Sequence, residues 1–242
     1  MKVVILAGGR GSRLNEHTKY VPKPMVKIGG KPILWHIMKI YSYYGVNNFI
    51  ICCGYKKNVI QKYFNKYLSS KIKKQHWKIT LVDTGKNTLT GGRLKRVKKL
   101  ISKEKFFFFT YGDGVANVNI KKLINFHVQN KKLATVTAVK PPGRYGVLNI
   151  KKNSIVDKFS EKNKGGDGYI NGGFFILSPK VLKYIKNDQT TWEQEPMLRL
   201  SKDKQLIAFK HNGFWQSMDT YRDKLELQKI WKANNAKWKI WK

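Results

Sequence analysis

The sequence predicts an α/β fold with a mixed, mostly parallel central sheet. Through the range 1–139, short β-branched and aromatic runs alternate with amphipathic stretches, which is typical of repeated βαβ units. The chain has 242 residues, of which 41% are hydrophobic, and this composition excludes a disordered chain. We therefore expect one compact domain.

Apolar periodicity predicts the elements of this first half. The segment Pro32–Tyr44 has apolar residues at helical spacing, and Gly45 is placed as a C-terminal stop. The segment Phe106–Thr110 is apolar without alternation, which predicts a strand buried on both faces. The same criteria predict strands at Val3–Leu6, Asn48–Cys53, Trp77–Val82 and Ala134–Val139, and helices at Asn58–Tyr67, Gly92–Ile101 and Asn119–Asn130.

The pattern changes after Pro141 and Pro142. Gly146–Ile150 and Ile155–Phe159 flank a short polar segment and predict a β-hairpin. Beyond it, strands are predicted at Phe174–Leu177 and Leu206–Lys210, and helices at Ser178–Lys186, Glu193–Lys202 and Thr220–Asn234. Because no low-complexity linker and no internal repeat interrupts the sequence, we expect a single domain of two closely joined halves, about 1–139 and about 140–242.

Basic residues dominate the composition. Lys and Arg number 49 against 14 Asp and Glu, which gives a formal net charge of +35. Such a charge can indicate a nucleic-acid-binding protein. Here, however, Lys outnumbers Arg 42 to 7 and the lysines are spread along the chain, whereas nucleic-acid sites favour clustered Arg. We predict no nucleic-acid partner, and a positive field that attracts small phosphorylated substrates.

Several other signals are absent. No apolar run approaches the roughly 18 residues of a membrane span, and the run after Met1 and Lys2 is too short for a signal peptide, so we predict a cytoplasmic protein with no membrane partner. Cys52 and Cys53 are neighbours in an apolar run and are expected to be reduced core residues. The histidines show no zinc spacing, and without a nucleophile elbow covalent catalysis is not expected.

Three tryptophans near the C-terminus, Trp231, Trp238 and Trp241, are interleaved with lysines. This pattern can bind a membrane surface or stack on single-stranded nucleic acid. Tryptophans beside lysines are also typical of contact surfaces. We expect this segment to pack against the body of the protein or against a partner subunit.

A glycine-rich segment, Leu6-Ala7-Gly8-Gly9-Arg10-Gly11-Ser12-Arg13-Leu14, follows the first predicted strand. Its three glycines let the backbone approach a bulky anion and turn N–H groups toward it. The segment lacks the Gly-Lys-Ser/Thr of a Walker loop and the third glycine of a dinucleotide-binding fingerprint. It predicts either a phosphate-binding loop or a tight turn that needs small residues.

Two charged residues stand in unusual positions. Lys23 lies between Pro22 and Pro24, which hold it on a stiff extended segment. Asp113, flanked by glycines, comes shortly after the buried strand Phe106–Thr110. Ligands of open α/β sheets bind beyond the carboxyl ends of the strands. Asp113 is therefore a candidate Mg²⁺ ligand, and an ordinary turn residue is the alternative.

Together these segments resemble the sugar-nucleotidyltransferase family, whose members transfer a nucleoside monophosphate from a nucleoside triphosphate to a sugar 1-phosphate. The glycine-rich loop, the segment Pro22-Lys23-Pro24-Met25 and the aspartate at a strand end carry this resemblance, which spans the whole chain. Four more segments are similar to the branch that uses CTP and glucose 1-phosphate: Thr90–Arg96, Thr110–Val115, Asn171–Phe175 and Phe214–Thr220.

The resemblance implies a Rossmann-like nucleotidyltransferase fold, with a nucleotide-binding first half and a second half that holds a smaller β-rich sugar-phosphate-binding part and the C-terminal helix. The implied reaction transfers CMP from CTP to glucose 1-phosphate with Mg²⁺ as cofactor, and it gives CDP-glucose and pyrophosphate. The implied catalytic residues are Arg13, Lys23, Asp113 and Asp219, of which the two aspartates hold Mg²⁺. The implied nucleotide-binding residues are Leu6, Ala7, Gly8, Gly9, Arg10, Gly11, Ser12, Arg13, Lys23, Thr88 and Arg93, and the implied sugar-phosphate-binding residues are Tyr111, Gly146, Glu161, Lys162 and Asn171.

The chain departs from the family pattern in two places. Ser12 stands where the family often has Thr, which keeps the hydroxyl group. The segment Leu68–His76 is shorter than in the branch, where this stretch contributes to subunit contacts; the implied assembly is a homo-oligomer. UTP or dTTP in place of CTP, and a non-catalytic binding subunit, stay open as alternatives. A shared ion requires carboxyl oxygens of Asp113 and Asp219 within about 6 Å of each other.

Overall fold

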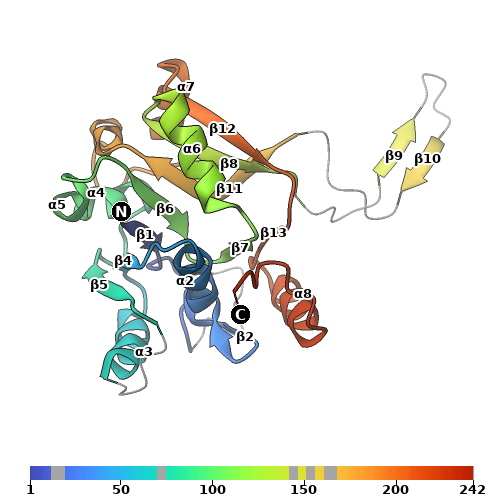
Figure 1. Cartoon of the computed structure of the whole chain (residues 1–242), viewed down its shortest axis with the longest axis horizontal. Helices are drawn as coiled ribbons and strands as arrows, with labels where there is room; N and C mark the ends of the chain where they lie inside the picture. The colour runs from blue at the N-terminus through green and yellow to red at the C-terminus, as the bar shows by residue number, and fades with distance from the viewer. Residues whose placement is uncertain (12–19, 70–74, 142–146, 151–155, 161–167, 242) are drawn as a thin grey trace.

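The computed structural model describes residues 1–11, 20–69, 75–141, 147–150, 156–160 and 168–241. Its centre is a seven-stranded sheet with the order β12-β8-β11-β6-β1-β4-β5 (Figure 1). The strands are β1 (Val3–Leu6), β4 (Asn48–Cys53), β5 (Lys78–Asp83), β6 (Phe107–Tyr111), β8 (Ala134–Val139), β11 (Ile170–Leu177) and β12 (Leu206–His211). Strand β11 runs antiparallel to both neighbours and the other pairs are parallel. The predicted mixed, mostly parallel α/β sheet is confirmed.

The strand order reverses at β1, which has β4 on one side and β6 on the other. The carboxyl ends of these strands meet at one edge, because Leu6 pairs with both Cys52 and Tyr111. Strand β11 runs the opposite way, so its first residues reach the same edge, and Asn171 pairs there with Ala138. Open α/β sheets bind ligands at such a switch point. The topology therefore gathers residues from distant parts of the chain at one edge.

Alternation along the central strands divides the core into two layers. Val3 of β1 and Phe108 of β6 belong to one layer, whereas Val4 and Phe109 belong to the other. This burial on both faces was predicted for the uninterrupted apolar run of β6. The first layer is covered by α2 (Ile33–Tyr43), α3 (Lys57–Ser69), α6 (Ile120–Asn130) and α8 (Tyr221–Lys232), and the second by α4 (Thr90–Arg96), α5 (Lys98–Ile101), η3 (Pro179–Tyr184) and α7 (Glu195–Lys202).

Three predicted elements differ from the structure in kind or by more than two residues at one end. The single helix predicted at Gly92–Ile101 is two short helices, α4 and α5, because the backbone at Val97 leaves the helical path with ψ near 11°. The helix predicted at Ser178–Lys186 is the 3₁₀ helix η3, closed by three-residue bonds such as the one from the N–H of Val181 to the carbonyl of Ser178. Strand β11 begins four residues earlier than predicted, at Ile170.

The described residues also form three two-stranded sheets. Strands β9 (Val147–Ile150) and β10 (Val156–Ser160) pair antiparallel, which confirms the predicted hairpin. The other two sheets were not predicted: β2 (Lys27–Ile28) with β3 (Lys31–Pro32), and β7 (Gly114–Ala116) with β13 (Trp215–Ser217). Strands of two or three residues are too short to show a period in the sequence.

The C-terminal tryptophans pack against the body of the protein, as expected. His36 of α2 is fully buried, and rings of Trp231, Trp238 and Trp241 lie 4.9 to 6.2 Å from its ring. The Nε2 atom of His36 lies 2.9 Å from the carbonyl of Ile28, and Nδ1 accepts from the indole N–H of Trp238 at 3.4 Å. Only a neutral imidazole can donate at one nitrogen and accept at the other. Burial accordingly lowers the pKa of His36 to about 4.

This imidazole makes stability depend on pH. Below pH 6.5 the unfolded chain binds a proton at His36 that the folded chain does not bind, so we expect the unfolding free energy to fall until about pH 4. The loss due to His36 is on the order of 3 kcal/mol. The measurement is the free energy of unfolding by urea between pH 4 and 7. The loss due to His36 is the part of the decrease with falling pH that is seen in wild type and not in His36→Gln. The variant His76→Gln, at an exposed position, should keep the wild-type slope, and a His36→Gln profile parallel to wild type would contradict the assignment.

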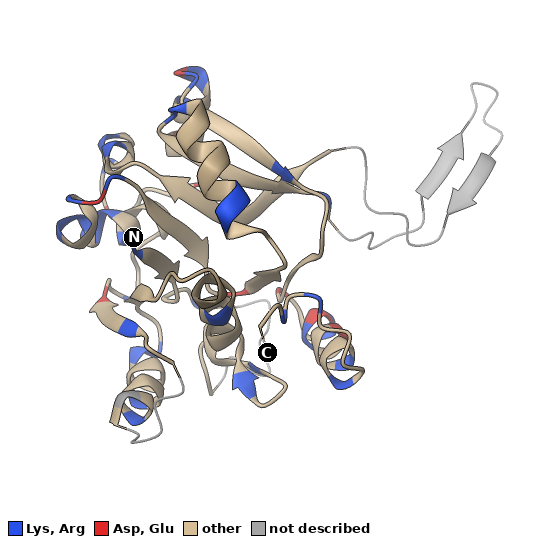
Figure 2. Ribbon diagram, in the orientation of Figure 1, with Lys and Arg blue, Asp and Glu red and all other residues tan. Residues whose placement is uncertain are grey.

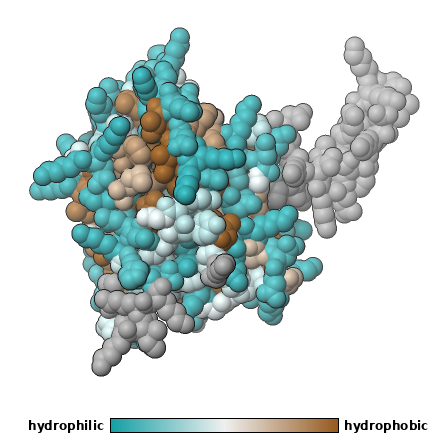
Figure 3. All heavy atoms as spheres, in the orientation of Figure 1, coloured by the Kyte–Doolittle hydropathy of each residue, from teal (hydrophilic) through white to brown (hydrophobic). Residues whose placement is uncertain are grey.

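In the view of Figure 2, Lys and Arg positions are spread over many helices and strands and do not gather in one region of the ribbon. The face drawn in Figure 3 is largely hydrophilic. Cys52 and Cys53 are unpaired by disulfide and buried, and burial raises the pKa of both thiols, which confirms the expected reduced core residues. Within the part of the chain that the structure describes, no helix has the length and apolar character needed to cross a membrane.

Candidate active site

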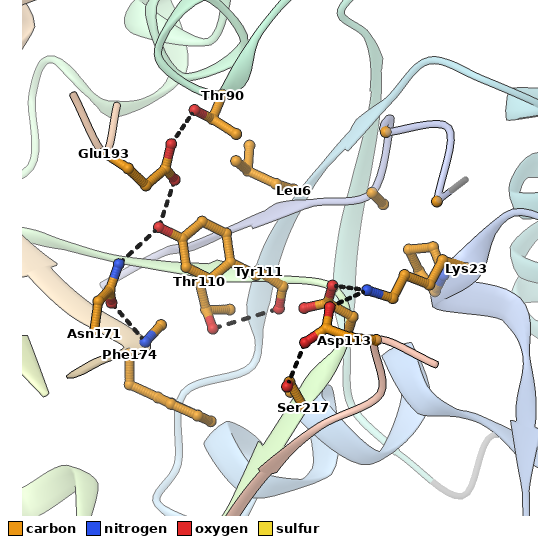
Figure 4. Close-up of a pocket in the computed structure, with 18 of the residues that line it drawn as sticks. Leu6, Lys23, Thr90, Thr110, Tyr111, Asp113, Asn171, Phe174, Glu193 and Ser217 are labelled. Atoms are coloured by element: carbon orange, nitrogen blue, oxygen red, sulfur yellow. Dashed lines mark hydrogen bonds and ion pairs between the residues drawn. The ribbon is translucent and has the colours of Figure 1, made fainter. Parts of the chain in front are cut away.

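A cavity of about 730 Å³ opens at the edge where the strand order reverses (Figure 4). Its walls are the carboxyl ends of β1 and β6, the first residues of β11, the segment that enters α4, and the segment that joins β13 to α8. This volume lies within the range of small-molecule sites. The cavity can hold a ligand of nucleotide size.

Inside the cavity one ammonium group bridges two carboxylates. Lys23 begins η2 (Lys23–Met25), and its Nζ donates to Oδ2 of Asp113 and to Oδ1 of Asp219, both at 2.7 Å. The two carboxyl oxygens therefore lie no further apart than twice this distance, which is below the limit of about 6 Å for ligands of one ion. The geometry meets the condition that the sequence set for a shared cation.

The two aspartates approach each other through backbone pairing. Strand β13 pairs with β7 so that Ser217 lies opposite Gly114. The next N–H along the chain, that of Met218, donates to the carbonyl of Asp113 at 2.8 Å. The distance between the carboxylates is thus set by a two-stranded sheet and not by side-chain contacts alone.

Asp219 is oriented by its neighbours. The hydroxyl of Ser217 donates to Oδ2 of Asp219 at 2.6 Å, and the backbone N–H of Asp219 donates to Asp223 at 3.0 Å. Asp223 and Thr220 form a capping box at the start of α8. The first turn of this helix therefore holds the aspartate in place.

Lys23 is a permanent positive charge at neutral pH. Burial alone would lower its pKa, but the charges and hydrogen bonds of Asp113 and Asp219 outweigh burial and raise the pKa. Pro24 contributes to the packing, since a Cβ atom on Gly112 would lie 2.9 Å from its Cγ atom and 2.6 Å from the carbonyl oxygen of Leu6. The glycine at position 112 is needed for the end of β6 to approach the lysine segment.

A buried guanidinium supports the glycine-rich loop. Arg93 of α4 is 4% exposed, and it donates to the carbonyl oxygens of Gly8, Cys53 and Gly85 at 2.8 to 3.2 Å. A Cβ atom on Gly8 would lie 2.0 Å from Nη1 of Arg93, so only glycine fits there. The resemblance implied that Arg93 touches CTP. In the structure Arg93 is one of the residues that line the cavity, and its guanidinium holds the backbone of the loop.

A second set of hydrogen-bonded polar side chains lies at the Tyr111 hydroxyl, on the opposite side of the Tyr111 ring from Lys23 and Asp113 (Figure 4). The hydroxyl of Tyr111 donates to Oε1 of Glu193 at 2.5 Å and accepts from Nδ2 of Asn171 at 3.0 Å. Thr90 donates to Oε2 of Glu193 at 2.6 Å. Burial, followed by the charge of Glu193, raises the pKa of Tyr111, so its hydroxyl stays protonated at neutral pH.

Most of the described residues implied by the resemblance line this cavity. Those that do are Leu6, Ala7, Gly9, Gly11, Lys23, Thr88, Arg93, Tyr111, Asp113, Asn171 and Asp219. Gly8 lies against Arg93, and Arg10 is exposed and donates to Asn87 at 3.3 Å; neither is part of the cavity lining. Ser12, Arg13, Gly146, Glu161 and Lys162 lie outside the described residues.

Three residues that line the cavity were not predicted as site residues from the sequence: Thr90, Glu193 and Ser217. Glu193 was expected at the start of a helix, where an acidic residue is common. In the structure α7 begins two residues later, and Glu193 faces the cavity instead. The one feature of the sequence that could have pointed to Glu193 is the scarcity of acidic residues, of which only 14 occur in the chain.

The family model described as "Nucleotidyl transferase" matches residues 2–235, and the chain belongs to this family. The chain is 52% identical to the glucose-1-phosphate cytidylyltransferase of Salmonella typhimurium and 46% identical to a probable glucose-1-phosphate cytidylyltransferase of Bacillus subtilis, over 100% of each chain in both cases. The crystal structure of HddC from Yersinia pseudotuberculosis complexed with GMP-PN is similar with a TM-score of 0.72 and 28% identity, covering 95% of this chain and 99% of that chain. The protein is a nucleotidyltransferase enzyme with the fold that the resemblance implied.

Proposed function

We propose that this enzyme transfers CMP from CTP to glucose 1-phosphate and releases pyrophosphate and CDP-glucose. The observation that supports the reaction is the cation of Lys23 held between Asp113 and Asp219 in the cavity at the switch point. The choice of substrates is supported by the names of the relatives at 52% and 46% identity.

The chemistry requires positive charge more than acid or base. A phosphate oxygen of the sugar 1-phosphate forms a bond to the α-phosphorus of CTP, and the bond from that phosphorus to the pyrophosphate oxygen breaks. The sugar phosphate is already ionised at neutral pH, so it needs neither a general base nor a protein nucleophile. Its repulsion from the triphosphate must be overcome by positioning and by neutralising groups.

The carboxylates of Asp113 and Asp219 fit a divalent cation. They already hold one positive charge between them, and carboxylate oxygens are ligands that Mg²⁺ prefers. Mg²⁺ is commonly bound by one or two carboxylates and completes its coordination with water and substrate phosphates. When bound, it would neutralise charge on the phosphates that must meet. Lys23 would then turn from the carboxylates to the phosphate oxygens and carry its charge with it.

We assign the nucleotide to the glycine-rich loop and Lys23, which come from the first half of the chain. The sugar 1-phosphate is assigned to Tyr111 and Asn171, with Glu161 and Lys162 from the resemblance. Since Tyr111 belongs to the first half, the proposed sugar site draws on both halves. A cytoplasmic location and assembly into a homo-oligomer stay predictions of the sequence.

The test is pyrophosphate release from glucose 1-phosphate with CTP, UTP, dTTP, GTP or ATP. We expect kcat/KM to be highest with CTP by at least about tenfold, and we expect chelation to abolish turnover and Mg²⁺ to restore it. A clear preference for UTP or dTTP would replace the proposed nucleotide. Binding of CTP without turnover of any sugar 1-phosphate would favour a non-catalytic binding subunit and contradict the proposal.

A further inference from the structure

We propose that Glu193 holds the proton of the Tyr111 hydroxyl, so that this hydroxyl meets the sugar only as a hydrogen-bond acceptor. This inference rests on the proposed function, because it concerns recognition of the sugar 1-phosphate. Glu193 acts through Tyr111 and is therefore a positioning residue. The ligand group that fits Tyr111 is a sugar hydroxyl, which can donate.

The Tyr111 hydroxyl already makes two hydrogen bonds within the protein. A tyrosine hydroxyl has one proton to donate, and its oxygen can also accept. Its proton goes to Glu193 at 2.5 Å, and its oxygen accepts from the N–H of Asn171 at 3.0 Å. The Asn171 amide cannot be turned round without loss, because its oxygen accepts from the backbone N–H of Gly173 at 2.8 Å. The Tyr111 hydroxyl therefore has no proton left for a ligand, and it can meet a ligand only through its accepting oxygen.

Glu193 is itself held in an accepting role. The hydroxyl of Thr90 accepts from the backbone N–H of Trp192 at 2.9 Å, so its own proton is directed to Oε2 of Glu193 at 2.6 Å. Both carboxyl oxygens of Glu193 thus receive a hydroxyl proton. A donor in place of Oε1 would oppose the bond from Tyr111.

The backbone around Glu193 is docked closely onto α4. The N–H of Gly91 donates to the carbonyl of Thr190 at 2.9 Å. A Cβ atom on Gly92 would lie 2.4 Å from the carbonyl oxygen of Asp188, so a side chain there would push the segment away. Trp192, the residue before Glu193, is fully buried in the second core layer. The carboxylate is therefore placed by packed backbone.

The ring of Tyr111 is equally confined. Gly173 has φ of +77°, and a Cβ atom there would lie 2.6 Å from Cδ2 of Tyr111. Because the ring, its donor and its acceptor are all fixed, the hydroxyl cannot reverse its direction when a ligand arrives. A sugar group that only accepts hydrogen bonds would face an acceptor at this point.

Fluorinated substrates test this directly. In glucose 1-phosphate with fluorine in place of the hydroxyl at position 2, 3, 4 or 6, the substituted group is similar in size but cannot donate. The measured quantity is the ratio of kcat/KM for glucose 1-phosphate to kcat/KM for each analogue. We expect the wild-type ratio to be largest at one position. The electronic effect of fluorine on the sugar is common to all enzyme variants and cancels when their ratios are compared.

Replacing the carboxylate of Glu193 should remove the preference of the enzyme for glucose 1-phosphate over the fluorinated analogue. In Glu193→Met the Tyr111 proton is released, so the hydroxyl no longer faces the fluorine only as an acceptor, and we expect the ratio at that position to fall roughly tenfold. In Glu193→Gln the amide oxygen can still accept from Tyr111, and the ratio should stay within about twofold of wild type. The matched control is Glu195→Met, which removes an exposed carboxylate paired with Arg199 at 3.5 Å and should leave the ratio unchanged.

Tyr111→Phe provides an independent measurement if Glu193→Met does not fold, because loss of the hydroxyl should lower the same ratio. An unchanged ratio in Tyr111→Phe, or equal losses for both substrates in Glu193→Met, would overturn the inference while the proposed function stands. A wild-type enzyme that does not turn over glucose 1-phosphate would overturn both.

Discussion

Replacing Asp113 by asparagine is expected to lower the rate of pyrophosphate release by about 10²- to 10³-fold and to leave the fold intact. The asparagine oxygen can still accept from Lys23, whose ammonium group now donates to Asp113 at 2.7 Å. The full negative charge that a divalent cation requires is lost. Asp219→Asn should have the same effect. Because the two carboxylates serve one ion, the double variant should be little worse than either single variant.

The measurement is kcat with CTP and glucose 1-phosphate over a Mg²⁺ titration, together with a thermal melt in the presence and absence of Mg²⁺. The control is Asp203→Asn, whose carboxylate accepts from Tyr184 at 2.7 Å and does not line the cavity. It should keep wild-type turnover. Near-wild-type turnover of Asp113→Asn would remove the basis for the shared cation.

Arg93→Met is expected to lower the free energy of unfolding by about 3 kcal/mol and to raise the KM for CTP. Methionine can fill part of the space, but it cannot donate hydrogen bonds. The carbonyl oxygens of Gly8, Cys53 and Gly85 would therefore lose the bonds that the guanidinium now donates to them. The glycine-rich loop would lose the contact that holds it against the end of the sheet. For a chain of this size the change corresponds to a Tm lower by about 6 to 12 °C.

One turn along the same helix, Arg96 supplies a matched control. Its guanidinium forms an ion pair with Asp188 in which both side chains are more than 40% exposed. Exposed pairs of this kind contribute less than about 1 kcal/mol, so Arg96→Met should change Tm and the KM for CTP little. Equal losses of stability in the two variants would show that the buried carbonyl contacts of Arg93 have no special role.

Local patterns in the sequence account for most of the fold. The strands Asn48–Cys53 and Ala134–Val139 have the predicted bounds, because apolar runs of this length need no distant information to be recognised. The pairs β2 with β3 and β7 with β13 were missed, since their strands are stabilised by each other and not by their own residues. Helix η3 was predicted as an α-helix because apolar spacing does not distinguish a short 3₁₀ helix.

The candidate site was predicted in part. The glycines before Ser12 and the proline pair around Lys23 restrict the backbone locally, and that restriction is visible in the sequence. Asp219 was predicted as a site residue only through the family resemblance. Glu193 was missed because its role depends on Tyr111 and Thr90, which are distant in the sequence and meet it only where its segment docks on α4.

The sequence by itself determined the alternation of strands and helices, the rigid lysine and the glycine-rich loop, because each depends on residues that are neighbours in the chain. The tertiary structure alone decided that Lys23 meets two aspartates at once and that Glu193 takes the proton of Tyr111. These contacts follow from the pairing of β7 with β13 and from the docking of the Glu193 segment on α4. The strand pairing and the docking each join segments that are far apart in the sequence. Because periodic patterns report only on neighbouring residues, no such pattern predicts these contacts.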